Sequence, residues 1–174
     1  MKLVIVGTGY VGLVSGACFA EFGYQTVCID KDISRIESLK SGKCPFYEPG
    51  MDNLLSKHLK DTKLLSFSTS LSDAIDDADL IFITVGTPSK RLDDDADLKY
   101  VWSVAAEIGK SIKKYSLIVT KSTVPVGTSK EIKKIIGNLV SDNLFDVVSN
   151  PEFLREGSAI DDFMRPDRVI VGTE

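Results

Sequence analysis

The sequence has little of several features that define common protein classes. Its 174 residues include 3 cysteines, 1 histidine and 1 tryptophan. No apolar run approaches the ~20 residues that a membrane-spanning helix needs, and the N-terminus lacks the apolar segment and cleavage site of a secretory signal peptide. An odd number of cysteines without metal-type spacing indicates reduced thiols. We therefore expect a cytoplasmic protein.

The charge balance excludes broad electrostatic partners. Lys and Arg total 21 against 25 Asp and Glu, a formal net charge of −4, and no long basic run is present. We expect neither nucleic acid nor a membrane surface as a partner. The acidic stretch 93–97 predicts a solvated loop before a helix, and we assign no metal site to it. With 43% hydrophobic residues the chain can bury a normal core, so residues 1–174 are expected to form one domain.

Short apolar runs rich in Val and Ile alternate with amphipathic segments at helical spacing. This β-α-β order, with continuously apolar strands, predicts an α/β fold with a doubly wound, mostly parallel sheet and helices on both faces. The expected strands are 3–6, 26–29, 64–67, 80–85, 117–120, 145–149 and 169–171. The expected helices are 11–22, 33–39, 51–59, 71–76, 98–113, 128–137 and around 158–163.

A glycine-rich turn, Gly7-Thr8-Gly9-Tyr10-Val11-Gly12, follows the first expected strand. In a G-x-G-x-x-G motif the first glycine permits a tight turn, the second lets the backbone approach a pyrophosphate, and the third lets helix and strand pack closely. Free N–H groups at the start of the helix and the helix dipole favour the phosphate charge. Together these features predict a Rossmann-type dinucleotide site.

Asp30 ends the second expected strand, where a carboxylate accepts hydrogen bonds from an adenosine ribose. Its charge would repel a 2′-phosphate, which favours NAD over NADP, although Lys31 and Arg35 lie nearby. Arg35 is predicted one turn into the next helix. It either lies against the adenine face or is an ordinary exposed helix charge.

Three further polar segments follow expected strands, at the edge where open α/β sheets bind ligands. They are 86–88, 121–127 and 150–157. In the last segment Glu152 and Glu156 are four residues apart, so both would share one face if Pro151 leads into a helix. Two converging acids would differ in pKa, leaving one able to accept a proton near neutrality. The alternative is a pair of helix N-terminal acids favoured by the dipole.

Together with residues 45–50 and 162–168, these motifs resemble the NAD-dependent nucleotide-sugar dehydrogenases, the UDP-glucose/GDP-mannose dehydrogenase family. The resemblance covers essentially the whole chain in family order. It implies NAD as cofactor and oxidation of a sugar C6 alcohol to the acid, with two NAD⁺ reduced and a cysteine thioester between the two steps. UDP-glucose is the expected substrate. GDP-mannose or a UDP-N-acetylhexosamine is an alternative, and a non-catalytic NAD-binding module is a second class of function.

The resemblance also implies roles for individual residues. Glu152 would be the acid/base group for water in thioester hydrolysis, Thr123 would position groups at the reacting centre, and Glu156 would contact NAD near the nicotinamide. The wall of the sugar-nucleotide site would include Glu152, Phe153, Leu154, Arg155 and Glu156. The cofactor contacts would be Gly7, Gly9, Tyr10, Val11, Gly12, Asp30, Arg35, Gly86, Thr87, Thr123 and Glu156.

The remaining reactive side chains receive no catalytic role. Cys18, Cys28 and Cys44 lie outside any segment like the family's glycine-rich stretch around its nucleophilic cysteine, and no such stretch is present in this sequence. We therefore expect a truncated chain that binds NAD⁺ without turnover, from a full-length enzyme that is a homo-oligomer. His58, on an amphipathic helix with lysines nearby, is expected on the solvated surface.

Overall fold

The computed structural model describes residues 1–88 and 96–173. Six strands form one sheet in the order β3-β2-β1-β4-β5-β6, and each of the described pairs is parallel. The strand order reverses between β1 and β4, as in doubly wound dinucleotide-binding folds. The strands are β1 (Lys2–Val6), β2 (Gln25–Ile29), β3 (Leu65–Ser68), β4 (Leu80–Ile83), β5 (Ser116–Thr120) and β6 (Phe145–Ser149).

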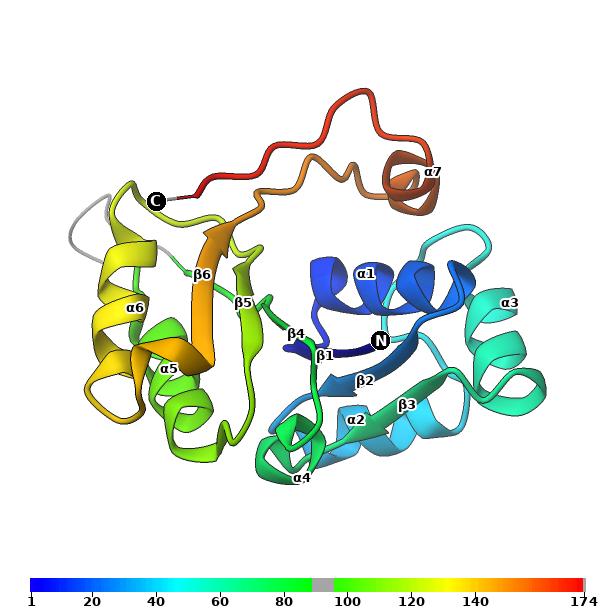
Figure 1. Ribbon diagram of the computed structural model, residues 1–174. Helices are drawn as coiled ribbons and strands as arrows, with labels where there is room; N and C mark the ends of the chain where they lie inside the picture. The colour runs from blue at the N-terminus through cyan, green and yellow to red at the C-terminus, as the bar shows by residue number, and fades with distance from the viewer. Residues whose placement is uncertain (89–95, 174) are drawn as a thin grey trace.

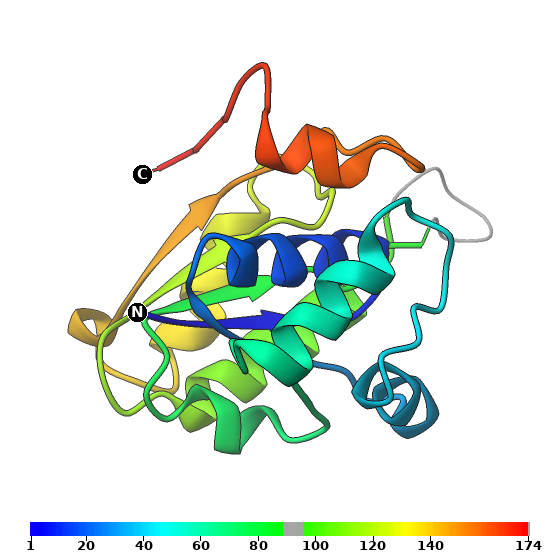
Figure 2. The same cartoon turned by 90° about the vertical axis from the view of Figure 1, so that its right-hand side faces the viewer.

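Helices cover both faces of the sheet, with α1 and α7 together on one side (Figures 1 and 2). Within the described ranges no helix is long and apolar enough to cross a membrane. A π-helical turn, Lys57–Asp61, continues α3, and a 3-10 turn, Asp142–Leu144, precedes β6. The α-helices are α1 (Tyr10–Glu21), α2 (Ile33–Lys40), α3 (Met51–Ser56), α4 (Leu71–Ile75), α5 (Lys99–Ser111), α6 (Thr128–Gly137) and α7 (Ala159–Met164).

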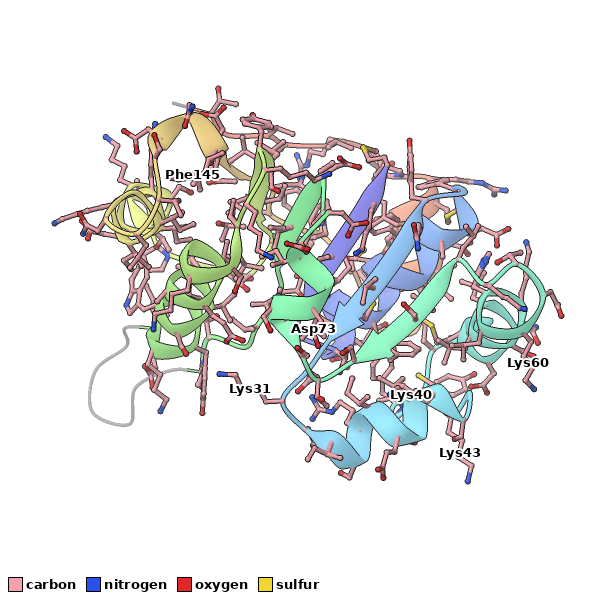
Figure 3. The ribbon with its side chains drawn as sticks, turned by 60° about the horizontal axis from the view of Figure 1, so that its bottom comes forward. Lys31, Lys40, Lys43, Lys60, Asp73 and Phe145 are labelled. Carbon is pink, nitrogen blue, oxygen red and sulfur yellow. The ribbon has the colours of Figure 1, made fainter. Side chains whose placement is uncertain are left out.

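Two buried apolar layers hold the helices to the sheet, one on each face. In β1, Val4 and Val6 point into the layer under α4, α5 and α6, whereas Leu3 and Ile5 point into the layer under α1. Because both faces are covered, the strands need apolar residues at successive positions, which explains their unbroken runs of Val, Ile and Leu. Phe145, at the start of β6, is 1% exposed and lies beside α6 (Figure 3).

The start of α1 lies very close to β1 and to the end of β4. A Cβ added at Gly12 would lie 1.9 Å from the carbonyl oxygen of Gly7 and 2.6 Å from the Oγ1 of Thr84. No side chain fits at that distance, so glycine is the residue that permits this helix–strand contact. A Cβ at Gly9 would meet no atom within 4 Å. The sequence expectation of close packing at the third glycine is confirmed.

The expected strand 169–171 is wrong. This segment touches β6 only through an isolated antiparallel bridge between Ser149 and Gly172. Val169, Ile170 and Val171 remain 68, 44 and 56% exposed, so these residues have strand propensity without a continuous partner. The expected extension of β4 to residue 85 is also wrong: β4 ends at Ile83, and beyond it the Val85 carbonyl accepts from the Ser122 hydroxyl at 2.7 Å.

His58 is buried, 1% exposed, which overturns the expectation that it lies on the solvated surface. Its Nε2 lies 2.7 Å from the Oε2 of Glu21, at the end of α1, and its Nδ1 lies 2.9 Å from the Oγ1 of Thr62. Lys57 donates to the same Glu21 carboxylate at 2.8 Å. The imidazole therefore connects the π turn to α1, and polar partners at both nitrogens make its burial tolerable.

The Glu21 carboxylate should stabilise the fold in a pH-dependent way. Hydrogen bonds from Lys57 and His58 lower the pKa of Glu21. Because the folded pKa lies below the unfolded value of ~4.3, this stabilisation is present above pH ~4.3 and is lost as the pH falls through the folded pKa. We expect Glu21→Gln to lower the free energy of unfolding by ~1 kcal/mol at neutral pH and by clearly less near pH ~3, in urea titrations.

Glu37→Gln, at an exposed position on α2, is the matched control and should have little effect at either pH. An equal loss of stability for Glu21→Gln at both pH values would contradict the assigned role of the charge.

Candidate functional site

A cleft of about 380 Å³ opens at the carboxyl ends of β1, β2 and β4, where the strand order reverses. Open α/β sheets place their ligands at this switch point. Its lining comes from the glycine turn, the end of β2, the start of α2, the segment after β4 and one face of α5. The lining residues with predicted roles are Gly7, Gly9, Asp30, Arg35 and Gly86, and those from α5 are Tyr100, Ser103, Val104 and Glu107.

The glycine turn presents free backbone donors at the start of α1. Gly9 is the N-cap and no side chain caps the helix. The backbone hydrogen bond from Leu13 to Gly9 begins the helical series, so the N–H groups of Tyr10, Val11 and Gly12 have no intrahelical acceptor. Such donors, added to the helix dipole, form a phosphate-binding position.

Tyr10, Val11 and Gly12, three residues predicted to contact the cofactor, are not among the residues that line this cleft. Gly12 is buried between α1 and the strands. The Tyr10 hydroxyl donates to the Glu48 carboxylate, and its ring packs on Phe46 at a centroid distance of 4.7 Å. Only the backbone N–H groups of Tyr10, Val11 and Gly12 are therefore left for a ligand at this end of α1.

Asp30 lies at the end of β2, inside the cleft. Its Oδ2 accepts from the backbone N and the hydroxyl of Thr8, both at 2.8 Å, and from Arg35 at 3.2 Å. Its Oδ1 accepts from the backbone N of Asp32 at 3.1 Å. Burial by itself raises the pKa of Asp30, but these hydrogen bonds and the Arg35 guanidinium outweigh it, and the net pKa is lowered. Asp30 is therefore a carboxylate at neutral pH, able to accept hydroxyl hydrogen bonds.

The two cations near Asp30 are both held by acids. The Arg35 guanidinium bridges Asp30 and Asp32, at 3.2 and 3.9 Å. Lys31, just beyond β2, extends toward α5, where its Nζ lies 3.9 Å from the Oε2 of Glu107 (Figure 3). Arg35 lines the cleft from the side of α2, and its planar group remains half-exposed there.

The loops that follow β4 and β5 are joined to each other. The Thr87 hydroxyl donates to the Thr123 carbonyl at 2.9 Å, and the Ser122 hydroxyl bonds the carbonyls of Ile83 and Val85. Thr123 itself is exposed. The structure therefore brings together two of the segments that sequence reasoning placed at one edge of the sheet.

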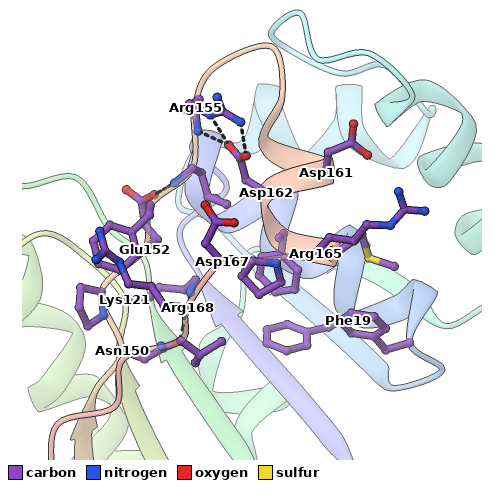
Figure 4. A pocket seen from close by; sticks show the side chains of 18 residues that line it. Phe19, Lys121, Asn150, Glu152, Arg155, Asp161, Asp162, Arg165, Asp167 and Arg168 are labelled. Atoms are coloured by element: carbon purple, nitrogen blue, oxygen red, sulfur yellow. Dashed lines mark hydrogen bonds and ion pairs between the residues drawn. The ribbon is translucent and has the colours of Figure 1, made fainter.

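A second, larger cleft of about 1080 Å³ lies between the second half of α1 and the segments 150–155 and 161–169 (Figure 4). Four of the residues predicted to form the sugar-nucleotide wall line it: Glu152, Phe153, Leu154 and Arg155. Glu156 is exposed and is not among its lining residues. Arg155 is bound to Asp162 through both its guanidinium and its backbone N, at 2.7–3.2 Å (Figure 4).

Pro151 does not lead into a helix, so the condition under which Glu152 and Glu156 would share a helical face is not met. Residues 150–158 are not helical, and α7 begins only at Ala159. The Oε2 of Glu152 accepts from the backbone N of Leu154 at 2.5 Å, a local bond that competes with helix formation. Gly157 has a φ of +84°, which is incompatible with a continuing helix.

Lys121 lines the larger cleft, although the sequence motif 121–127 predicted no role for this residue. It is 7% exposed and donates from Nζ to the Asn150 Oδ1 at 3.1 Å (Figure 4). Its Nζ lies 5.5 Å from the centre of the Phe163 ring. Burial lowers the pKa of Lys121, and the charge of Glu152 acts in the opposite direction. The signal in the sequence that could have identified Lys121 is its position directly after a continuously apolar strand.

The cysteines are poorly suited to nucleophilic chemistry. Burial raises the pKa of Cys18 to about 12, and it also raises the pKa of Cys28 and of Cys44. A neutral thiol is a weak nucleophile at pH 7. Of the acidic stretch 93–97, residues 93–95 lie outside the described residues. Within residues 1–88 and 96–173 no group of three or more His, Cys, Asp or Glu is placed to hold a metal ion.

Comparison with known proteins gives these clefts a context. Residues 1–174 match the sequence profile of the UDP-glucose/GDP-mannose dehydrogenase family, NAD binding domain. The chain belongs to this family. It is 49% identical over 174 residues to UDP-glucose 6-dehydrogenase of Rhizobium meliloti (strain 1021), covering 100% of this chain and 40% of that protein.

Solved structures of family members have the same fold. A UDP-glucose dehydrogenase from the hyperthermophilic archaeon Pyrobaculum islandicum superimposes with a TM-score of 0.93 at 40% identity, over 98% of this chain and 40% of that one. GDP-mannose dehydrogenase from Pseudomonas aeruginosa, solved as a ternary complex, gives a TM-score of 0.95 at 36% identity, over 100% of this chain and 41% of that one. The chain thus spans about 40% of the length of these relatives.

The 380 Å³ cleft fits the NAD of this family on its own geometry. The first N–H groups of α1 have no intrahelical acceptor, as a pyrophosphate site requires, and the open space beside Gly9 lets a ligand approach the backbone. Asp30 is ionised at the end of β2, where an adenosine ribose is bound in this fold. NAD, bound here, supplies the hydride acceptor of the family's chemistry.

We expect Asp30→Ala to weaken NAD⁺ binding by ~1–3 kcal/mol, because a charge-assisted hydrogen bond to the ribose is lost. Isothermal calorimetry with NAD⁺ measures this, and thermal unfolding establishes that the variant remains folded without the Thr8 contacts. Asp146→Ala, at an exposed position on β6, is the control and should bind NAD⁺ like the parent chain. Unchanged affinity in Asp30→Ala would remove Asp30 from the site.

Proposed function

We propose that this chain is the NAD-binding part of an enzyme that oxidises UDP-glucose at C6 to UDP-glucuronate. The observation that carries the proposal is the 49% identity to a UDP-glucose 6-dehydrogenase along the whole of this chain. The separation of a dinucleotide cleft from a larger cleft that contains Glu152 and Lys121 supports it. In this proposal residues 1–174 form one domain and the complete enzyme is a homo-oligomer.

The overall oxidation removes four electrons from the substrate, two to each NAD⁺, and consumes one water. The C6 alcohol would lose a hydride to NAD⁺ and a proton to a base, giving an aldehyde. A cysteine thiolate would add to the aldehyde, and loss of a second hydride to a second NAD⁺ would leave a thioester, which water hydrolyses to the acid and the free thiol. The raised pKa values of Cys18, Cys28 and Cys44 argue against their supplying the thiolate, so we assign it to a part of the enzyme outside this sequence.

Within this chain we assign the proton transfer of the hydrolysis to Glu152. Its carboxylate lines the larger cleft, and its charge raises the pKa of Lys121, which is buried and donates to the neutral amide of Asn150. A general base must reach the water whose proton it takes, and Glu152 is the acid of the 152–156 segment that lines this cleft. Thr123 would position the reacting groups, and Glu156 would contact NAD near the nicotinamide.

The remaining members of the segment 152–156 would form the wall of the sugar-nucleotide site. Phe153 and Leu154 line the cleft with apolar surface, and the ion pair between Arg155 and Asp162 fixes the course of the backbone between them and α7. A wall held in this way presents backbone groups to a ligand at fixed positions.

GDP-mannose is the alternative substrate favoured by a specific observation, the TM-score of 0.95 to a GDP-mannose dehydrogenase at 36% identity. A substrate panel separates the possibilities: the full-length protein is given UDP-glucose, GDP-mannose and a UDP-N-acetylhexosamine, and NADH formation is followed. We expect turnover of UDP-glucose by the full-length protein and none by residues 1–174 alone, which should still bind NAD⁺. Rapid turnover of another nucleotide sugar with none of UDP-glucose would overturn our choice.

Glu152→Gln in the full-length protein should slow thioester hydrolysis more than the first hydride transfer, because the amide cannot accept the proton of water. The expected signature in rapid-mixing kinetics is a stoichiometric burst of NADH followed by a turnover rate lowered by ~10²–10⁴-fold. Glu131→Gln, at an exposed position on α6, should behave as the parent enzyme. Equal slowing of the burst and of the steady state would count against this role for Glu152.

A further inference from the structure

A buried carboxylate, Glu48, joins three segments that are far apart in the sequence. It is 7% exposed and belongs to the loop before α3. Its Oε2 accepts from the Tyr10 hydroxyl and from the backbone N of Gly157 at 2.9 Å, and its Oε1 accepts from the backbone N of Ile160 at 3.2 Å. Among the described residues no ion pair is formed with Glu48, so its charge is held by hydrogen bonds alone.

Tyr10 brings the glycine turn into this cluster. It is the first residue of α1, next to the N-cap Gly9, so its backbone N–H belongs to the donors that face the pyrophosphate position. Its ring packs on Phe46, in the same loop as Glu48. Burial and the hydrogen bond to Glu48 raise the pKa of Tyr10 to about 12, so the hydroxyl keeps its proton at neutral pH and donates it to the carboxylate.

Gly157 brings the segment between β6 and α7 into the same cluster. Its N–H lies 2.9 Å both from the Glu48 carboxylate and from the Tyr10 oxygen, and its φ of +84° favours glycine. The Tyr10 hydroxyl also lies 3.4 Å from the Arg155 carbonyl. Gly157 directly follows the segment 152–156, and Ile160 lies in the first turn of α7. The carboxylate thus holds the downstream end of the proposed substrate wall.

We propose that Glu48 is a positioning residue that couples the dinucleotide turn to the segment 152–157, so that bound NAD⁺ and an ordered substrate wall favour each other. This rests on the proposed function, because the wall is the sugar-nucleotide site only if that function holds. The physical route is short: a pyrophosphate on the first N–H groups of α1 restrains Tyr10, whose hydroxyl then holds Glu48 in place for the N–H groups of Gly157 and Ile160. An unpaired buried carboxylate is costly, so removal of one donor loosens the others.

Thermodynamic linkage makes the coupling measurable from either side. If bound NAD⁺ raises the equilibrium constant for ordering of the wall by some factor, then the ordered wall raises the affinity for NAD⁺ by the same factor. The rate of hydrogen exchange at the amides of Gly157 and Ile160 measures how often the wall opens, and calorimetry measures the affinity for NAD⁺. A residue that merely supports the fold would change the exchange of these amides without making it depend on NAD⁺.

The experiment compares the 174-residue chain with Tyr10→Phe, which removes the hydroxyl but keeps the ring on Phe46. In the parent chain we expect NAD⁺ to slow exchange at Gly157 and Ile160 by at least about fivefold. In Tyr10→Phe this NAD⁺-dependent slowing should disappear, and the Kd for NAD⁺ should rise by the same factor. Glu48→Gln should give the same result, because its NH2 group, a donor, would replace one of the two oxygens that accept from the backbone N–H groups of Gly157 and Ile160. This second variant decides the question if Tyr10→Phe does not fold.

Tyr115→Phe is the matched control. Tyr115 is an exposed tyrosine whose hydroxyl donates to a carboxylate, that of Asp146 at 2.9 Å, at the opposite side of the sheet from β2. It should retain both the slowing and the affinity. NAD⁺ binding without any slowing in the parent chain, or full slowing in Tyr10→Phe, would overturn the coupling and leave the proposed function standing. Absence of NAD⁺ binding would overturn both.

Discussion

The close approach of α1 to β1 and β4 at Gly12 is the contact on which the functional surface depends. It places the first turn of α1 at the carboxyl edge of the sheet, beside Asp30, and it sets the direction of the rest of the helix. Further along, Phe19 and Phe22 of the same helix line the larger cleft, and Glu21 anchors the buried His58. One helix therefore contributes its two ends to different tasks, and its position is set by a contact that tolerates no side chain.

Charge is handled differently in the two clefts. Asp30 is surrounded by N–H donors and by Arg35, so its negative charge is stabilised before any ligand arrives, which is the preorganisation that a ribose site requires. Lys121 is buried with a neutral amide and an aromatic ring as its partners, and burial lowers its pKa. In the first cleft, Arg35 balances the charge of Asp30 and Glu107 balances that of Lys31, all within this chain. The second keeps a cation whose charge is only weakly compensated, as ligand-binding sites often do.

Local chemistry in the sequence predicted much of the fold. Six of the seven expected strands and all of the expected helices exist, because parallel strands that are covered on both faces must be apolar throughout, and because caps such as Asp32, which accepts from the backbone N of Arg35, mark helix starts. The failures occur where local signals are satisfied by other partners. Residues 169–171 have strand propensity but one bridge to β6, and Pro151 leads into a turn that Glu152 closes with its own side chain.

By itself, the sequence determined that the fold is a doubly wound parallel α/β sheet, because repeated βαβ units with apolar strands build one. It also determined the dinucleotide turn and the acid at the end of β2, since both belong to one βαβ unit. Only the tertiary structure decided how the side chains of distant segments meet. The cluster of Tyr10, Glu48 and Gly157, the burial of His58 against Glu21, and the placement of Lys121 beside Asn150 join residues that have no periodic relation to one another. Hydrogen bonds of this kind depend on where the packed helices bring the loops together, and no local pattern encodes that position.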